Sequence, residues 1–247
     1  MHEIEGYQAF LSSLPSSDQY EVGELLVPDL LMAEEGGLRM FYSPFDWVNG
    51  SARLIILGIT PGWTQMELAC RTARAALSAG KTMAQACKLA KQRASFAGSM
   101  RTNLIRMLDT LDLPRLLRIE SSADLFGRAA HLLHTGSALR YPIFVGSKNY
   151  TGSNPSPTKS DLLLRMAREV LAPELAAVPD AAIVPLGRTV EKILNLLAAE
   201  GEIEPRRWLS GFPHPSGANG HRARLFEENR VSLALQLQDI LGSPHAA

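Results

Sequence analysis

Two short polar turns, each directly after an apolar run, constrain the fold of this chain most. The first turn has the sequence GITPG at residues 58–62 and follows the run at 54–57. The second has the sequence HPSGANG at residues 214–220 and follows the run at 208–212. Short apolar runs of this kind are typical of buried strands, and in open α/β proteins the turns after such strands converge outside the carboxyl ends of the sheet. We therefore expect one active site built from both ends of the chain.

Further apolar runs alternate with helical patterns. Residues 142–145 and 181–186 are apolar throughout, as buried parallel strands tend to be, so four strands are expected in all. Residues 27–47 are interpreted as an irregular entry segment. Helices are expected at 3–13, at 66–111 (two or three helices), from 122 to before 136, and at 159–172, 188–200 and 222–241. Strands that alternate with helices indicate an α/β protein with a largely parallel sheet and helices on both faces.

The size and composition of the chain suit one globular domain. Of its 247 residues, 46% are hydrophobic and 20% are charged, and neither an internal repeat nor a long linker interrupts the pattern. We therefore expect a single domain over residues 1–247. No apolar run approaches the roughly 18 residues of a membrane span, and residues 1–12 lack the features of a signal peptide. The expectation is a cytoplasmic protein without a membrane partner.

Charge and metal-ligand patterns narrow the function classes. The 25 basic residues balance the 25 acidic ones, so nucleic-acid binding would need a local patch. Cys70 and Cys87 lack CxxC spacing and are interpreted as reduced helix thiols. His131 and His134 are three apart on an expected helix, but no carboxylate or cysteine accompanies them at ligand spacing, which favours a packing or surface role. We expect no metal, iron–sulfur cluster or other cofactor.

The first turn, at residues 58–62, predicts a rigid polar loop after the strand. Gly58 lets the backbone turn sharply after the strand, Pro61 restricts its own φ, and Gly62 permits close approach of a ligand or another backbone. A purely structural strand-to-helix junction is the alternative. The pentapeptide has neither the GxGxxG of a dinucleotide site nor the GxxxxGK[ST] of a phosphate loop, so both of those functions are set aside.

The second turn carries the reactive groups. His214 lies between two prolines, while Ser216 and Asn219 offer a hydroxyl and an amide. An imidazole on so rigid a loop can direct a hydrogen bond at a developing anion. A turn or capping histidine is the alternative. The adjoining His221 and Arg222 could contact phosphates, which favours a functional turn.

The order of these motifs, strand–GxxPG near the start and strand–HPSxxN near the end, resembles the uracil-DNA glycosylase superfamily. Members of that superfamily carry GINPG or GQDPYH in the first motif and HPS-type sequences in the second. The resemblance extends from about residue 42 to 241, and the run at 182–186 followed by Gly187 and a helix is similar to the third strand of the family. It implies a three-layer α/β/α domain around a short four-stranded parallel sheet, with a helical insertion at about 66–98.

The activity that this resemblance implies is that of a DNA glycosylase. Such enzymes extrude a nucleotide and hydrolyse the N-glycosidic bond of a flipped-out uracil or other damaged or modified pyrimidine, so DNA is the expected partner. By position, His214 would hydrogen-bond a carbonyl oxygen of the leaving base. Ser216 and the backbone of Gly217 would hold the neighbouring phosphate, with Asn219, His221 and Arg222 as further DNA-binding candidates.

The resemblance also indicates which residues would form the base pocket. The backbone of Ile59 and Gly62 would line it, and Trp63 would border it. Asn149 is the candidate for the amide that reads the base, with a turn asparagine as the alternative. Phe96 is the candidate for the aromatic floor on which the base stacks, with core packing as the alternative.

This chain departs from the family at the residue that orients the attacking water. Many relatives have Asn or Asp there, whereas this chain has Thr60, whose hydroxyl can bond a water but brings no negative charge. Either Thr60 suffices at a slower rate, or Asp46 or another carboxylate enters from elsewhere, or catalysis has been lost. A surface or capping aspartate is the alternative for Asp46. The absent four-cysteine pattern also separates the chain from the iron–sulfur branch.

Those departures leave the substrate and two other functional classes open. Thr60 and the long helical region would suit a base other than uracil, including an enlarged modified pyrimidine of viral DNA. A non-catalytic DNA-binding relative is the first alternative, which Thr60 favours. A hydrolase of free nucleosides or nucleotides is the second, which the neutral net charge favours.

Overall fold

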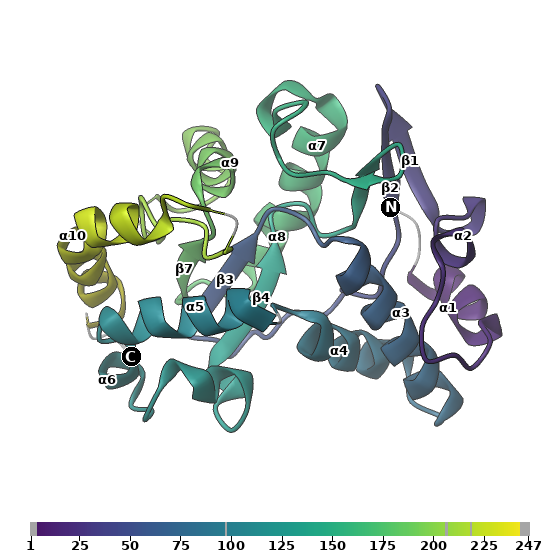
Figure 1. Cartoon of the computed structure of the whole chain (residues 1–247), viewed down its shortest axis with the longest axis horizontal. Coiled ribbons are helices and arrows are strands. Elements are labelled where there is room, and N and C mark those ends of the chain that lie inside the picture. The colour runs from purple at the N-terminus through teal and green to yellow at the C-terminus, as the bar shows by residue number, and fades with distance from the viewer. Residues whose placement is uncertain (1–3, 97, 206, 218, 243–247) are drawn as a thin grey trace. The chain divides into compact units, whose positions relative to one another are not determined.

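The computed structural model describes residues 4–96, 98–205, 207–217 and 219–242 (Figure 1). The chain divides into two compact units, and each is described here by itself. The first unit comprises Met1–Val48, Thr60–Ser95 and Leu139–Met166, and the second unit comprises Asn49–Ile59, Phe96–Ala138 and Ala167–Ala247. That residues 1–247 form one domain stays a prediction.

A parallel sheet forms the centre of the second unit. Strand β3 (Leu54–Gly58) lies between β4 (Leu133–Ser137) and β7 (Ala182–Pro185), and all three run in the same direction (Figure 1). Every residue of β3 is buried, as expected for a strand covered on both faces. The predicted α/β class with a parallel sheet is confirmed. The run predicted as a fourth strand, 208–212, contributes only an isolated parallel bridge between Trp208 and Ile183.

Helices cover both faces of this sheet. One face carries Leu54 and Ile56, which belong to a hydrophobic cluster with buried residues of α5 (Gly98–Thr110), α6 (Leu113–Leu117) and α10 (Arg222–Gly242). His134 pairs in register with Ile55 and therefore points to the opposite face, where it contacts Glu174 of α8 (Ala172–Ala176).

The helix after β7 follows from its apolar spacing. Val190, Ile193, Leu194 and Leu197 are the buried residues of α9 (Arg188–Ala199), which is the i, i+3, i+4, i+7 pattern of a helix with one face on a core. The predicted helices at 188–200 and 222–241 are confirmed. A π-helical turn, Ala167–Leu171, precedes α8.

An antiparallel sheet belongs to the first unit. Its strand order is β1–β2–β5–β6, and every neighbouring pair is antiparallel. The strands are β1 (Leu31–Glu35), β2 (Leu38–Phe41), β5 (Ile143–Val145) and β6 (Lys148–Asn149). Two predictions are corrected here. The run at 142–145 is not the second strand of the parallel sheet, and the segment at 27–47, expected to be irregular, holds a 3₁₀ turn (Pro28–Leu30) and the β1–β2 hairpin.

The helices of the first unit include a long hairpin. Helix α3 (Trp63–Ser78) and helix α4 (Met83–Ala94) are joined by a turn that contains Gly80 at φ +75°, a conformation that glycine adopts without strain. The Thr82 hydroxyl caps α4 by accepting the N–H of Gln85. The prediction of two or three helices over 66–111 is confirmed by α3, α4 and α5. The remaining helices of this unit are α1 (Ile4–Ser13), α2 (Val22–Leu25), the 3₁₀ turn Pro157–Lys159 and α7 (Asp161–Met166).

The helix predicted from residue 122 to before 136 is wrong. Two 3₁₀ turns, Ser122–Phe126 and Ala130–Leu132, occupy its first part, and β4 occupies its end. The sequence of β4 is LHTGS, which has too few apolar residues to be recognised as a buried strand. His131 and His134 therefore do not share a helix.

Among the described residues, no helix is long and apolar enough to cross a membrane. In the same part of the chain, no three His, Cys, Asp or Glu side chains are grouped as ligands of a metal ion.

Candidate functional site

The predicted site residues belong to both units. Asp46, Thr60, Gly62, Trp63 and Asn149 lie in the first unit. The second unit holds Ile59, Phe96, His214, Ser216, Gly217, Asn219, His221 and Arg222.

His214 is held by its own turn. Its Nδ1 accepts the backbone N–H of Ser216 at 3.2 Å, and its carbonyl oxygen accepts the side-chain amide of Asn219 at 3.1 Å. The turn lies close to the residue after β7: a Cβ on Gly187 would come within 3.2 Å of the His214 Cβ, and Gly187 has φ +93°. The backbone around the imidazole is therefore fixed from two sides.

These contacts define the protonation state of the imidazole. Because Nδ1 accepts a backbone N–H, the ring proton of a neutral His214 is on Nε2. Burial lowers the pKa of His214 below its usual 6.5, which keeps the ring neutral near pH 7. No other described residue forms a recorded hydrogen bond with Nε2. His214 thus presents a neutral N–H donor.

Hydrogen bonds from Asn103 and Arg222 also hold the histidine turn. The Asn103 side-chain amide donates to the Pro215 carbonyl at 2.9 Å, and Arg222 Nη1 donates to the Ser216 carbonyl at 2.7 Å. Asn219 Oδ1 accepts the N–H of His221, so both ends of the Asn219 amide are engaged in the turn. Gly217 and His221 are exposed. Asn103, which the sequence did not single out, thus helps to hold this turn in place.

Phe96 packs at the carboxyl end of β3. Its ring atom Cε1 would lie 3.5 Å from a Cβ built on Gly58, and the residue is 8% exposed within the hydrophobic cluster of the second unit. The core-packing alternative therefore describes its contacts in this structure. Ile59, the residue after Gly58 in the chain, is half-buried.

The first turn is tied to β6. Asn149 Oδ1 accepts the backbone N–H of Trp63 at 2.8 Å, and a Cβ on Gly62 would approach Asn149 Nδ2 to 3.2 Å. Gln65 Oε1 accepts the N–H of Gly62 at 3.0 Å. Because Oδ1 is engaged, the exposed Asn149 offers its Nδ2 donors. The structure therefore brings together three of the residues that the sequence assigned to the base pocket.

The Thr60 hydroxyl donates its proton in a hydrogen bond to another residue of the protein. Its Oγ1 donates to the Tyr141 carbonyl at 2.9 Å, which leaves only oxygen lone pairs for another group. The Tyr141 hydroxyl in turn donates to Asp46 Oδ1 at 2.5 Å, and Arg140 contacts the same oxygen at 3.3 Å. Asp46 and Thr60 are thus linked through Tyr141, a residue that the sequence did not single out.

Asp46 is not the surface aspartate of the alternative interpretation. Its side chain is 4% exposed, and its Oδ2 and the Tyr42 hydroxyl are both buried. Burial, and then the charge of Asp46, raises the pKa of both Tyr42 and Tyr141, so both phenols stay protonated. A carboxylate in this position orients Tyr141 and has no oxygen free for solvent.

A buried acid–base pair lies in the second unit. His134 Nδ1 accepts the N–H of Asn49 at 3.3 Å, so Nε2 carries the proton that it shares with Glu174 Oε1 at 2.6 Å. Both side chains are almost fully buried. The packing role predicted for His134 is confirmed. Glu174 is 40 residues away in sequence, and no local spacing could have indicated the pair.

The comparisons with known proteins identify a relative. No family model matches the chain. Over 229 residues the chain is 42% identical to the "Uncharacterized protein YoxB" of Bacillus subtilis (strain 168), and the match covers 92% of this chain and 87% of that protein. The chain therefore belongs to the same family as YoxB.

Proposed function

We propose that this protein is a DNA glycosylase that hydrolyses the N-glycosidic bond of a flipped-out pyrimidine nucleotide, uracil or a modified pyrimidine. The observation that carries this proposal is the state of His214: a neutral imidazole, fixed on a rigid turn beside the residue after β7, whose Nε2–H makes no hydrogen bond to a residue that the structure describes. A preorganised hydrogen-bond donor stabilises the negative charge that develops on a departing base.

The proposed chemistry separates charge between the sugar and the base. As the bond between C1′ and the base nitrogen breaks, the sugar gains oxocarbenium character and the bonding electrons leave with the base. The Nε2–H of His214 would donate to a carbonyl oxygen of that base, where the negative charge collects. Water then adds to C1′, and the proton that it loses is finally carried by the released base. His214 acts as a hydrogen-bond donor throughout and need not be protonated.

Thr60 can position the water as an acceptor. Its proton is engaged by the Tyr141 carbonyl, so a nearby water would donate to Oγ1 and keep a lone pair free for C1′. Asp46 fixes Tyr141 and thereby the acceptor geometry of Thr60. Because Thr60 carries no negative charge, we expect slower hydrolysis than with a carboxylate at this position.

The remaining groups would bind base and backbone. The Nδ2 of Asn149 would donate to a carbonyl of the base, since Oδ1 is engaged by Trp63. Arg222 uses Nη1 in the turn and keeps further N–H groups for a phosphate beside Ser216.

The test is single-turnover incubation with labelled oligonucleotides that carry uracil, mismatched thymine, hypoxanthine or modified cytosines, followed by alkali to cut abasic sites. We expect cleavage of at least one pyrimidine substrate, and a loss of about 100-fold or more in His214→Ala. His131→Ala, which removes an exposed histidine, is the matched control and should retain the rate. Failure of the wild-type protein to release any of these bases, or full activity of His214→Ala, would contradict the proposal.

One observation favours a second candidate, a DNA-binding relative without turnover. Both oxygens of Asp46 are inaccessible and Thr60 is uncharged, so the first turn offers no carboxylate to an attacking water. Oligonucleotide binding that weakens with salt, together with no base release under any condition above, would support this candidate.

A further inference from the structure

A trough in the first unit shares no residue with the predicted site. It has a volume of about 650 Å³ and runs along α3 and α4 beside the loop that holds Ser17. Its lining includes Arg71, Lys81, Leu89, Arg93 and three alanines at the end of α3. Three of them are cations and none is a carboxylate, so the lining suits an anion.

Small side chains create the hollow. Ala75, Ala76 and Ala79 lie three, four and seven positions after Thr72, which places them on one side of α3 and of its C-cap. Their methyl groups leave room where longer side chains would fill the space between the helices. Leu89 of α4, which is 37% exposed, adds an apolar wall. The alanines and Leu89 form an apolar floor, and the three cations belong to the same lining.

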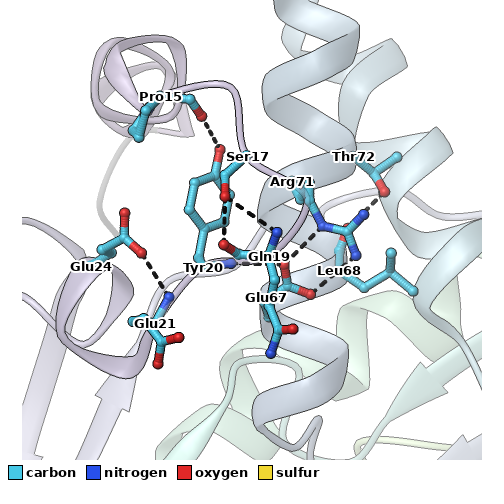
Figure 2. Close-up of polar contacts among 10 residues, drawn as sticks. All are labelled: Pro15, Ser17, Gln19, Tyr20, Glu21, Glu24, Glu67, Leu68, Arg71 and Thr72. Carbon is cyan, nitrogen blue, oxygen red and sulfur yellow. Dashed lines mark hydrogen bonds and ion pairs between the residues drawn. The ribbon is translucent and has the colours of Figure 1, made fainter.

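Arg71, one of the lining residues, is held in place by polar contacts that Figure 2 shows. Its Nε and Nη2 contact the two oxygens of Glu67 at 2.8 and 3.3 Å, and Glu67 Oε1 also accepts the backbone N–H of Tyr20. The hydrogen bond that Arg71 donates to Glu67 raises the pKa of Arg71, and the negative charges of Glu67 and Asp18 raise it further. These carboxylates offset the charge of Arg71 but leave it further N–H donors.

The uncompensated positive charge comes from Lys81 and Arg93. Both are exposed, and neither has a recorded ion-pair partner among the described residues. Lys81 precedes α4 and Arg93 lies in its last turn, so the helix of 12 residues, about 18 Å long, separates them. One phosphate group cannot contact both cations. A chain of phosphates that follows the trough can.

We propose that this trough binds a single DNA strand, with phosphates at Lys81 and Arg93 and with sugars and bases over the alanine floor and Leu89. Proteins that bind single strands without reading their sequence combine a cationic groove that tracks the backbone with aromatic side chains on which the bases stack. In this trough the alanine methyl groups and Leu89 would take the place of those aromatic side chains. This binding goes beyond the proposed base excision and does not depend on it, since none of the trough residues acts on the scissile bond.

The experiment measures binding of a labelled oligothymidylate of about 15 nucleotides by fluorescence anisotropy, between about 50 and 200 mM salt. The strand holds no uracil, so excision does not enter the readout. The variant Lys81→Gln/Arg93→Gln is compared with wild type and with Lys159→Gln/Arg165→Gln. The second pair removes the same charges from exposed positions of the first unit outside the trough.

Each lost phosphate contact should reduce the slope of log affinity against log salt by about 0.7. We therefore expect a reduction of about 1.4 in the trough variant and an unchanged slope in the control. Both cations are exposed, and equal melting temperatures of the three proteins would show that the fold is retained. Equal slopes, an absence of strand binding by wild type, or equal competition by polyglutamate would overturn this assignment. A protein that binds the strand but excises no base would refute only the glycosylase proposal.

Discussion

At the scale of single residues, one hydrogen bond in each unit defines what His214 and Thr60 can offer chemically. The bond from the Ser216 N–H to His214 Nδ1 places the imidazole proton on Nε2, and the bond from Thr60 to the Tyr141 carbonyl leaves Thr60 as an acceptor. His214 is thus a donor and Thr60 an acceptor. In the proposed reaction, His214 would face the departing anion and Thr60 the attacking water.

The burial of His214 predicts the pH dependence of both rate and stability. Because burial lowers the pKa in the folded protein below 6.5, the unfolded chain binds more protons between the two values. The contribution to stability is therefore complete above pH 6.5 and is lost as the pH falls towards the folded pKa. We likewise expect the rate of base release to be retained just below pH 6.5 and to fall only as the pH approaches the folded pKa of His214. An NMR titration of the His214 ring measures the value, and a result of 6.5 or higher would contradict this prediction.

The link from Asp46 to Tyr141 predicts a stability difference between two tyrosines. Tyr141→Phe removes a donor from a buried carboxylate and should lower the free energy of unfolding by about 1 to 3 kcal/mol. Tyr150→Phe is the control, since its hydroxyl donates to the neutral Pro155 carbonyl and should cost about 1 kcal/mol. Urea unfolding measures both. If adding Asp46→Asn to Tyr141→Phe recovered none of the loss, the carboxylate would not be its cause.

At the scale of elements, one junction in each unit holds residues of the predicted site. The residue after β7 meets the histidine turn, and the start of α3 is bound to β6 through Asn149. Helix α9 and helix α10 were predictable from their apolar spacing, because burial of one helix face imposes that period. Strand β4 was not, because its hydrogen bonds to β3 and its covering helices hold a sequence with little apolar character of its own.

Gly187 provides a test of the junction after β7. Gly187→Ala would place a methyl group 3.2 Å from the His214 Cβ at φ +93°, and we expect a loss of about 1 to 3 kcal/mol in stability together with a slower base release. Gly201→Ala is the matched control, because Gly201 has φ +77° but nothing within 4 Å of an added Cβ. Thermal melting and single-turnover rates compare the two. A rate as high in Gly187→Ala as in Gly201→Ala would show that the junction does not position His214.

The α3–α4 hairpin predicts unreactive thiols. Burial raises the pKa of Cys70 to about 12 and that of Cys87 to about 11, so almost no thiolate is present at pH 8. We expect native protein to react slowly with the disulfide reagent DTNB at that pH, and protein unfolded in urea to react fully. Rapid reaction of either thiol in the native protein would contradict its burial.

At the scale of the whole molecule, the charge balance decides how DNA could be bound. With 25 basic and 25 acidic residues the chain has no net field, so attraction to DNA must arise at local groups such as Arg222 or Lys81 and Arg93. The alternative function on free nucleosides requires no such groups.

Salt dependence separates these two functions. Binding to a strand through several phosphates should weaken steeply as salt rises, because each contact releases counterions. Binding of a free nucleoside should scarcely respond. Affinities measured between about 50 and 200 mM salt for an oligonucleotide and for its nucleoside make the comparison. A salt-insensitive nucleoside affinity that exceeds the oligonucleotide affinity would favour the nucleoside hydrolase.

By itself, the sequence determined the α/β class, strands β3 and β7 of the parallel sheet and most of the helices. These features depend on apolar spacing and turn residues, which lie close together along the chain. It also singled out both polar turns. Only the tertiary structure decided that 143–145 pairs in an antiparallel sheet, that Asp46 is buried against Tyr141, and that His134 meets Glu174. Such contacts join residues that are distant in sequence, and their hydrogen bonds exist only once the chain has folded.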